Sequence, residues 1–305
     1  MPEPRGKVHV PHLQAIFWAL CAYALWVFYD TCNKLAGQAG IPAGEVLGFT
    51  GASGLLTLIA LAVKTGNLRK LRPQKTQLVF VSGLLASAST FCNVIAVKHL
   101  PLSLFYVCVF STPLITALLA ASFLNERLGR KKTAAIALGF AGVVIAIDPS
   151  FDSANGSIAG YAAMFISVTS AALSWIVLRW VTQTESLWSI IGVFHLMIIA
   201  ASLCSLLLFE RAAAVVPGSS MVALMVGAGL LNLAARLLVT YAIRHTAAAN
   251  VTQCNYTQIL WAGAVAHLIW GDVPRVSLLL GATLIIVSGI ALAYEARRAD
   301  KHSTG

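Results

Sequence analysis

The sequence is poor in charged residues, which make up only 10% of its 305 residues, whereas 58% are hydrophobic. A soluble domain carries roughly a quarter of its residues as charged side chains, so this composition excludes an ordinary soluble globular protein. The mean hydropathy of +0.82 indicates that hydrocarbon surrounds most of the surface. The chain is therefore predicted to be an integral membrane protein.

The sequence also lacks the patterns that bind nucleic acids, metals or cofactors. The formal net charge is +10, but Lys and Arg lie in short loops between apolar runs and form no stripe with aromatic residues. This distribution argues against a nucleic-acid partner. The six cysteines include no CxxC pair and lie in or beside apolar runs. We expect them to be small buried hydrophobes, with no disulfide framework, metal site or cofactor.

What the sequence does have is a series of long apolar runs. A helix needs about twenty apolar residues to cross the hydrocarbon core of a bilayer. Ten stretches approach this length: 13–36, 43–63, 76–97, 102–124, 131–147, 158–181, 187–209, 219–243, 249–270 and 276–294. The chain is thus predicted to be all-α, with ten transmembrane helices. Lys and Arg concentrate in the loops on the side of the N-terminus, so both termini are expected in the cytoplasm.

The two halves of the chain match at a constant offset of 146 residues, which takes Gly83 to Gly229. Polar loop residues stay in register as well: the offset takes Lys98 to Arg244, His99 to His245, Cys108 to Cys254 and Glu126 to Asp272. A general likeness between apolar helices would not keep these residues in register, so we interpret the match as an internal duplication. The predicted units are a tail at 1–12, a five-helix repeat at 13–147, an outer loop at 148–157, a second five-helix repeat at 158–294 and a tail at 295–305.

A duplication of five helices has a consequence for function. Because five is odd, the second repeat enters the membrane from the face opposite to the first. Inverted repeats of this kind adopt two near-mirror arrangements, each open to one side, with the substrate near the midplane between the halves. The sequence therefore predicts an alternating-access carrier of a small solute, as a monomer or a weak homodimer.

Each half carries an acidic residue, a small residue nine positions later and then a glycine within an apolar run. These residues are Glu126, Ala135 and Gly142 in the first half, and Asp272, Gly281 and Gly289 in the second. Two further segments, 24–26 and 96–101, and the residues Pro113 and Trp175 add to the pattern. The halves resemble the EamA-type repeat of the drug/metabolite transporter superfamily over about 13–294.

This resemblance implies a ten-helix transporter. Its nearest match is to bacterial exporters of amino acids, aromatic ones included, in the inner membrane. The chain departs from the family pattern in two places. Many relatives carry an Arg in the second helix, whereas 44–63 has none, and Ile259 stands where the second half would repeat Pro113.

The first predicted helix carries a polar and aromatic stripe, formed by Tyr23, Trp26, Asp30 and Asn33 on one face. We interpret the stripe as a wall of the central cavity. The alternative is an aromatic belt at the membrane surface, in which Asp30, near the outer end of the helix, pairs with Lys34.

Aromatic residues on other helices are further candidates for substrate binding. Tyr106 and Phe110 share a face of the fourth helix, and the offset takes Phe110 to Tyr256. Trp175 is a candidate as the counterpart of Trp26. Aromatic residues at helical spacing are also typical of plain packing, although a buried Tyr hydroxyl needs a polar partner.

Arg236 is the one charge deep in a predicted span, and Asn232 lies one turn away on the same face. An arginine at this depth costs about 3 kcal/mol on insertion scales, so it should face the bundle or water. We expect it to hold an anionic group such as a substrate carboxylate; the alternative is that its side chain extends to the cytoplasmic surface. The offset relates Arg236 to Thr90, with Asn93 one turn on, and these residues complete the candidate site.

Carboxylates are missing from the middle of the predicted spans. Those in or beside the spans fall near helix ends: Asp30, Glu45, Glu126, Glu210 and Asp272. Proton or sodium coupling usually relies on carboxylates at mid-depth. The sequence therefore predicts a facilitator or exchanger that moves its solute down a gradient.

Three other functions compete with an amino-acid carrier. Residues 51–54 match the GxSG motif of rhomboid-type serine proteases, but neither His195 nor His267 has the context to activate Ser53, so no enzyme activity is expected. A receptor or scaffold without transport is a second possibility. One deep arginine disfavours phosphorylated substrates, whereas aromatic walls with few polar anchors suit either an amino acid or a lipophilic cation or drug.

Overall fold

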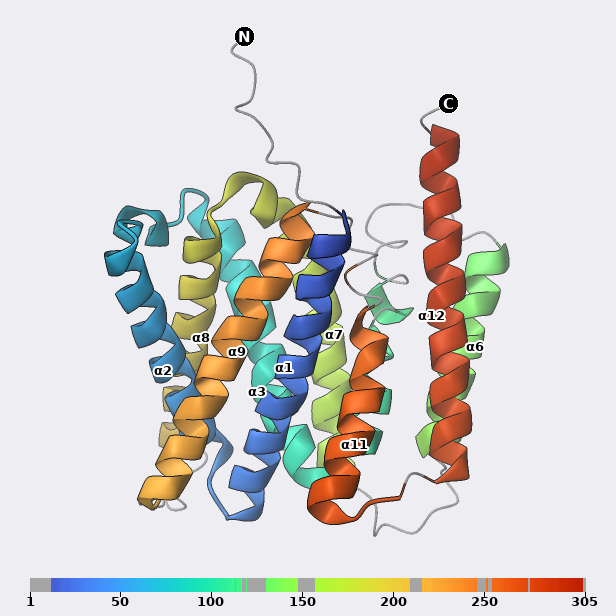
Figure 1. Cartoon of the computed structure of the whole chain (residues 1–305), viewed down its shortest axis with the longest axis horizontal. Coiled ribbons are helices and arrows are strands. Elements are labelled where there is room, and N and C mark those ends of the chain that lie inside the picture. The colour runs from blue at the N-terminus through green and yellow to red at the C-terminus, as the bar shows by residue number, and fades with distance from the viewer. Residues whose placement is uncertain are drawn as a thin grey trace.

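The computed structural model describes residues 12–112, 114–116, 119, 130–147, 157–208, 216–245, 251, 254–273 and 275–303, and its regular elements are all helices (Figure 1). The long elements are α1 (His12–Gln38), α2 (Ala43–Lys64), α3 (Thr76–His99), α4 (Leu102–Val109), α6 (Arg130–Ile147), α7 (Ile158–Thr184), α8 (Leu187–Leu208), α9 (Ser219–His245), α11 (Gln258–Trp270) and α12 (Val276–Ser303). Two short 3-10 helices are η1 (Leu68–Leu71) and η3 (Cys254–Thr257).

Length and hydropathy decide which helices cross a membrane. Six helices are long and apolar enough within the described ranges, namely α1, α2, α3, α7, α8 and α9. Four shorter apolar helices lie at Leu104–Thr116, Thr133–Gly142, Trp261–Trp270 and Val276–Ala291. Lipid offers no hydrogen-bond partners, so each helix satisfies its own backbone groups. The prediction of an all-α membrane protein of about ten helices is confirmed.

The tenth helix differs from the prediction at its end. The apolar run was expected to give way to a tail at 295, but α12 continues past Tyr294 to Ser303 (Figure 1). The added turns are rich in Ala, Arg, Glu and Lys. These residues favour helix in water as well as in lipid, so the end of the apolar run does not end the helix.

The helices pair across the two halves of the chain. The most extensive contacts are those of α1 with α9, α3 with α7, α6 with α12 and α2 with α8. The offset relates α3 to α9, which end at the corresponding residues His99 and His245. The α1–α9 pair is thus the symmetry counterpart of the α3–α7 pair, while α2–α8 and α6–α12 lie on the pseudo-two-fold axis. This arrangement is that of a five-plus-five repeat.

Small residues allow α2 and α8 to approach closely. Ser202 Oγ donates a hydrogen bond of 2.7 Å to the carbonyl oxygen of Gly44. A Cβ atom on Gly48 would lie 2.8 Å from the same hydroxyl, and one on Gly54 would lie 2.2 Å from Nε2 of His195. The small residues of α2 therefore serve helix packing.

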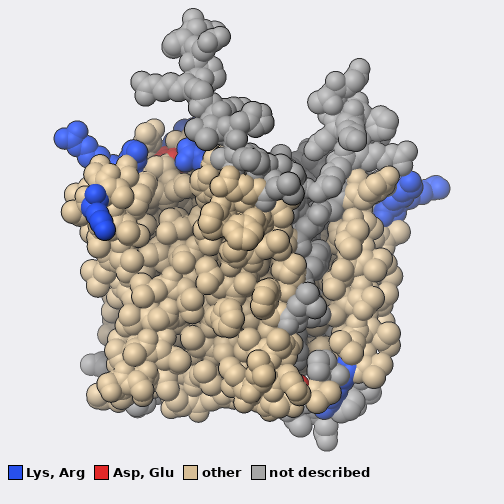
Figure 2. All heavy atoms as spheres, in the orientation of Figure 1, with Lys and Arg blue, Asp and Glu red and all other residues tan. Residues whose placement is uncertain are grey.

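Hydrogen bonds also join the two halves at both ends of the bundle. At one end the buried carboxylate of Glu185 accepts from the backbone N–H groups of Gln74, at 3.0 Å, and Lys75, which precede α3. At the other end Trp270 Nε1 donates to Gln38 Oε1 over 3.0 Å. Lys and Arg gather near the rims of the face in Figure 2 and leave a broad uncharged band between them, as a membrane-spanning surface requires.

Candidate functional site

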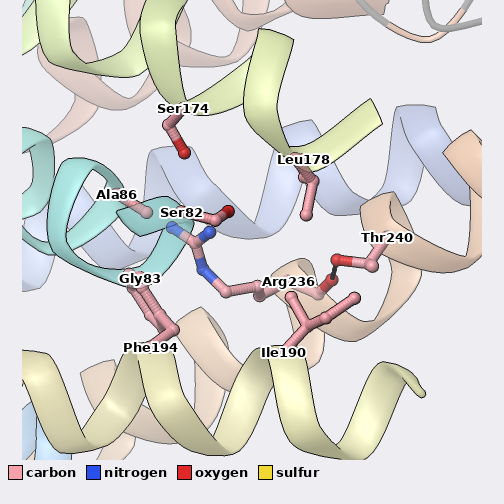
Figure 3. Close-up of a pocket in the computed structure, with 9 residues that line it drawn as sticks. All are labelled: Ser82, Gly83, Ala86, Ser174, Leu178, Ile190, Phe194, Arg236 and Thr240. Atoms are coloured by element: carbon pink, nitrogen blue, oxygen red, sulfur yellow. Dashed lines mark hydrogen bonds between the residues drawn. The ribbon is translucent and has the colours of Figure 1, made fainter. Parts of the chain in front are cut away.

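A pocket lies on the boundary between the two halves (Figure 3). It is small and opens partly to the outside. The lining residues are Ser82, Gly83 and Ala86 from α3, Ser174 and Leu178 from α7, Ile190 and Phe194 from α8, and Arg236 and Thr240 from α9. One helix of the first repeat and three of the second meet here, so relative movement of the halves changes the shape of the pocket.

Arg236 dominates the electrostatics of the pocket. Its guanidinium carbon lies 3.5 Å from the ring centroid of Phe194 and 6.0 Å from that of Trp26. Its Nε atom is buried without a hydrogen-bond partner, and no carboxylate of the described chain pairs with the guanidinium. The side chain points across the pocket towards Ser82 and Ser174 (Figure 3). It therefore remains inside the bundle and does not extend to the cytoplasmic surface.

Asn232 joins the aromatic stripe of α1 to the helix that carries Arg236. Its Oδ1 accepts a hydrogen bond of 3.1 Å from Trp26 Nε1, while its Nδ2 is buried without a partner. Trp26 is half-buried. The indole therefore lies inside the bundle and not in a belt at the membrane surface. Tyr23 packs beside it, with the two ring centroids 5.4 Å apart.

Several buried polar atoms at and around Tyr29, which faces Arg236, have no hydrogen-bond partner among the described residues. They are the hydroxyls of Tyr29 and Thr50 and both amide atoms of Asn33. Tyr29 interacts electrostatically with Arg236 and lies near Asn33 and Thr50, but these groups do not adopt hydrogen-bonding geometry. Buried polar atoms are normally paired. The cluster therefore has hydrogen-bonding groups that are close together but poorly aligned with one another.

Other predicted residues lie beside the pocket without lining it. Trp175 is half-buried and packs against the same apolar cluster as Tyr23 and Trp26. The Thr90 hydroxyl is used within α3, where it donates to Ala86 O over 2.9 Å. Asn93 Oδ1 accepts from Ser167 Oγ of α7 over 2.6 Å. Thr90 and Asn93 thus form part of a helix contact whose hydrogen bonds are already satisfied.

Tyr106 and Phe110 belong to a separate apolar cluster around α4. Both are almost fully buried there, with ring centroids 6.5 Å apart. The Tyr106 hydroxyl donates a hydrogen bond of 2.6 Å to Asp30 Oδ2. The backbone of Tyr256 forms part of η3, but its side chain lies outside the described part of the structure, as does Pro113.

The structure contradicts the alternative interpretation of Asp30. The alternative placed its carboxylate in the headgroup region, paired with Lys34. Asp30 is instead buried, with 7% of its surface exposed, and Lys34 Nζ donates to Leu100 O over 2.9 Å. The partner of its carboxylate is the Tyr106 hydroxyl, which neither helical spacing nor the repeat predicts.

Sequence reasoning misses Phe194, Tyr29 and Thr50. A phenylalanine in an apolar helix gives no signal that separates an arginine platform from ordinary packing. Tyr29 directly precedes Asp30, and Thr50 directly precedes the motif at 51–54. A search for polar residues on the face of α2 that contacts α9 would have found Thr50. It would not have found the role of Phe194.

The geometry around Ser53 does not support a protease. Its hydroxyl donates to Phe49 O over 2.6 Å within its own helix. His195 is fully buried, and its Nδ1 pairs with Ile191 O over 2.9 Å. Neither contact joins a nucleophile to a base. His195 has the packed role that its apolar surroundings suggest.

Comparisons with known proteins agree with this architecture. The model of the EamA-like transporter family matches residues 13–147 and 158–294. None of the curated proteins compared with the chain matches it. Among solved structures, 28 chains match. One, titled "Crystal structure of protein", has a TM-score of 0.68 and 20% sequence identity, and the match covers 93% of this chain and 98% of that one. At this identity the likeness concerns the fold alone.

Proposed function

The chain belongs to the EamA-like transporter family, and from this premise we propose that it carries small amphiphilic solutes that bear a carboxylate, namely amino acids, aromatic ones included. The members of this family are membrane transporters and not enzymes. The observation that carries the proposal is the guanidinium of Arg236, which stacks on Phe194 in the pocket and has no carboxylate beside it among the residues that the structure describes.

An unneutralised guanidinium inside a membrane protein is costly. An anionic solute that binds reversibly would offset this cost while it is bound. A carboxylate matches the planar fork of arginine with two parallel hydrogen bonds. Asn232 Nδ2 and the Tyr29 hydroxyl, both unpaired, lie on the neighbouring faces of α9 and α1. These groups suit the remaining polar atoms of a small solute that binds beside Arg236.

Aromatic rings supply the apolar part of the same site. Phe194 and Trp26 both lie against Arg236, and Tyr23 packs on Trp26. An aromatic or aliphatic side chain gains burial against such rings. A lipophilic cation would gain the same burial, but the positive charge of Arg236 would repel it. The site therefore favours an amino acid over a cationic drug.

We further propose how access alternates. The halves meet along the pairs α1–α9 and α3–α7, and cross-half hydrogen bonds at Glu185 and at Gln38 join them at the two ends. Breaking one set while the other holds would open the pocket to one side only. We place the chain in a bacterial inner membrane with both termini in the cytoplasm. A tag after Ser303 should then resist membrane-impermeant protease in intact spheroplasts.

The direct test is counterflow in proteoliposomes that contain the purified protein. Vesicles loaded with unlabelled phenylalanine should take up labelled phenylalanine from outside. Phenylalaninamide, which keeps the ring but lacks the anionic group, should compete poorly, and tetraphenylphosphonium should compete no better. Arg236→Gln should weaken phenylalanine binding by about 30-fold or more, because truncating one side of a buried charge pair costs about 2–5 kcal/mol.

The matched control is Thr90→Val, at the position that the repeat relates to Arg236. It removes a hydroxyl that is already bonded within α3, so counterflow should change little. If Arg236→Gln leaves the affinity and the rate as they are, or if the amide is carried as well as the acid, the carboxylate assignment is wrong. Absence of counterflow for every amino acid tested would favour a different solute class.

A further inference from the structure

Asp30 is a buried carboxyl group outside the pocket. It lies on α1, eight residues before the helix ends at Gln38, and only 7% of its surface is exposed. The Tyr106 hydroxyl of α4 donates to Asp30 Oδ2 over 2.6 Å and lies 3.4 Å from the carbonyl oxygen of Trp26. Tyr106 itself is 1% exposed, so this contact is shielded from water.

No cation neutralises Asp30 among the described residues. Lys34 lies one helical turn away, but its Nζ donates to Leu100 O over 2.9 Å, stands 5.1 Å from the ring of Trp270, and interacts electrostatically with Asp272. The titratable groups that face Asp30 are Tyr106 from α4 and its neighbours Tyr29 and Cys32 on α1. None of these three groups carries a positive charge.

Its burial, with no cation beside it among the described residues, therefore favours the neutral form of the Asp30 carboxyl. Burying an ionised carboxylate without a cation costs far more than one hydrogen bond from a tyrosine returns. Protonation removes that cost, and the hydrogen bond from Tyr106 to Oδ2 remains possible because Oδ2 then acts as the carbonyl oxygen. Water reaching this end of α1 would make the charged form stable again.

We propose that Asp30 is a proton-binding site that couples solute movement to the movement of a proton. The proposal rests on the carrier function proposed above. When the bundle opens to one side, a proton from that solution adds to the Asp30 carboxylate and forms the carboxylic acid. When the bundle opens to the other side, the acid releases the proton and the carboxylate forms again. One cycle thus moves one proton for each Asp30.

This proposal replaces the expectation of purely downhill exchange. That expectation followed from the position of Asp30 and the other carboxylates near helix ends, away from the middle of the membrane. The buried contact with Tyr106 puts Asp30 out of reach of water in this arrangement. Its carboxyl group can therefore gain or lose a proton when the bundle opens. The two ends of α1 then have separate tasks, with Trp26 beside the solute and Asp30 binding the proton.

The test uses proteoliposomes with equal concentrations of labelled phenylalanine inside and outside. A pH gradient is imposed while valinomycin and potassium hold the membrane potential at zero. The wild-type protein should accumulate phenylalanine for one polarity of the gradient and lose it for the other. In Asp30→Asn the ratio of gradient-driven accumulation to counterflow should fall by about tenfold or more, because the amide binds no proton.

Two variants act as controls. Asp272→Asn removes a carboxyl group that faces Lys34 at the outer end, and its ratio should equal that of the wild type. Asp30→Glu keeps a titrating group and should retain coupling. If Asp30→Asn does not fold, proton exchange upon phenylalanine binding to wild-type protein in weakly buffered detergent, read with a pH dye, replaces it. Binding without any proton exchange would then overturn the proposal.

The outcomes separate this proposal from the proposed function. Wild-type counterflow without gradient-driven accumulation leaves the carrier in place and overturns the proton site. If Asp30→Asn accumulates phenylalanine as strongly as the wild type does, the carrier function also stands and the proton site is overturned. A wild-type protein without phenylalanine counterflow would instead contradict the proposed function.

Discussion

The interfaces α1–α9 and α3–α7 are symmetry counterparts, but their polar groups are used differently. In α3–α7, Ser167 Oγ donates to Asn93 Oδ1 over 2.6 Å and contacts Ser89 Oγ and Ser89 O, each over 3.1 Å. No buried side-chain atom of these two helices lacks a partner within the described residues. In α1–α9, by contrast, Tyr29, Asn33, Asn232 and Arg236 each keep an unpaired buried atom.

The difference shows how a duplicated fold divides its tasks. The backbone geometry is shared, since the same offset relates α3 to α9. The α3–α7 interface uses its hydrogen bonds to hold two helices together. The α1–α9 interface leaves polar groups unsatisfied at an energetic cost, which a bound solute would offset. Arg236 and its counterpart Thr90 are the clearest pair, because one is a charge without a partner and the other a hydroxyl bonded within its helix.

The largest expected effect extends the comparison to the neighbouring symmetry-related contacts α2–α9 and α3–α8, at two glycines that the offset relates, Gly229 and Gly83. A Cβ atom on Gly229 would lie 1.9 Å from Ser53 Oγ and 2.9 Å from the backbone oxygen of Thr50, whereas one on Gly83 would lie 3.0 Å from Val193 Cγ1. Gly229→Ala should therefore lower the free energy of unfolding by about 1–3 kcal/mol, and Gly83→Ala by about 1 kcal/mol or less. Thermal unfolding of the purified protein in detergent measures both.

A double variant separates side-chain crowding from backbone crowding at this contact. Adding Ser53→Gly to Gly229→Ala removes the hydroxyl but leaves Thr50 O in place. Only part of the lost stability should return. Equal destabilisation by the two single alanine substitutions would show that α2 packs no more tightly on α9 than α8 packs on α3.

A smaller effect is expected from the hydrogen bond that joins α1 to α9. Trp26→Phe removes the Nε1 donor and leaves Asn232 Oδ1 buried without a partner, which costs about 1–2 kcal/mol. The variant should lower the unfolding temperature and also raise the KM for phenylalanine, since Trp26 lies over Arg236. Trp175→Phe, at the counterpart tryptophan of α7, should affect KM less. A larger KM change for Trp175→Phe would place the solute on the other interface.

The fold could be predicted from the sequence because its determinants are local or periodic. The lengths of the apolar runs indicate ten helices, and the offset of 146 relates α3 to α9 and so indicates their shared role. The end of α12 was not predicted, since helix propensity and not hydropathy extends it to Ser303. Run length locates a membrane span but says little about a helix that continues into water.

The candidate site could be predicted only where a residue type is costly at its depth. Arg236 and Trp26 stand out because a charge or an indole N–H inside lipid needs a reason. Phe194 and Tyr29 do not stand out, because their roles depend on which faces of α8 and α1 turn towards α9. The bond from Tyr106 to Asp30 joins residues that are far apart in the chain. Such contacts depend on helix crossing, which one sequence does not reveal.

The smallest expected effect tests the satisfied interface directly. Ser167→Ala removes the hydroxyl that bonds to Asn93 Oδ1 and Ser89 O, so the free energy of unfolding should fall by about 1 kcal/mol. The KM for phenylalanine should stay within about twofold of the wild type, because α3 and α7 use these groups for each other and not for a solute. Thermal unfolding and counterflow on the same preparation give both numbers. A raised KM at unchanged stability would mean that Ser167 and Asn93 bind solute, and that the polar groups of the α3–α7 interface are not reserved for holding these two helices together.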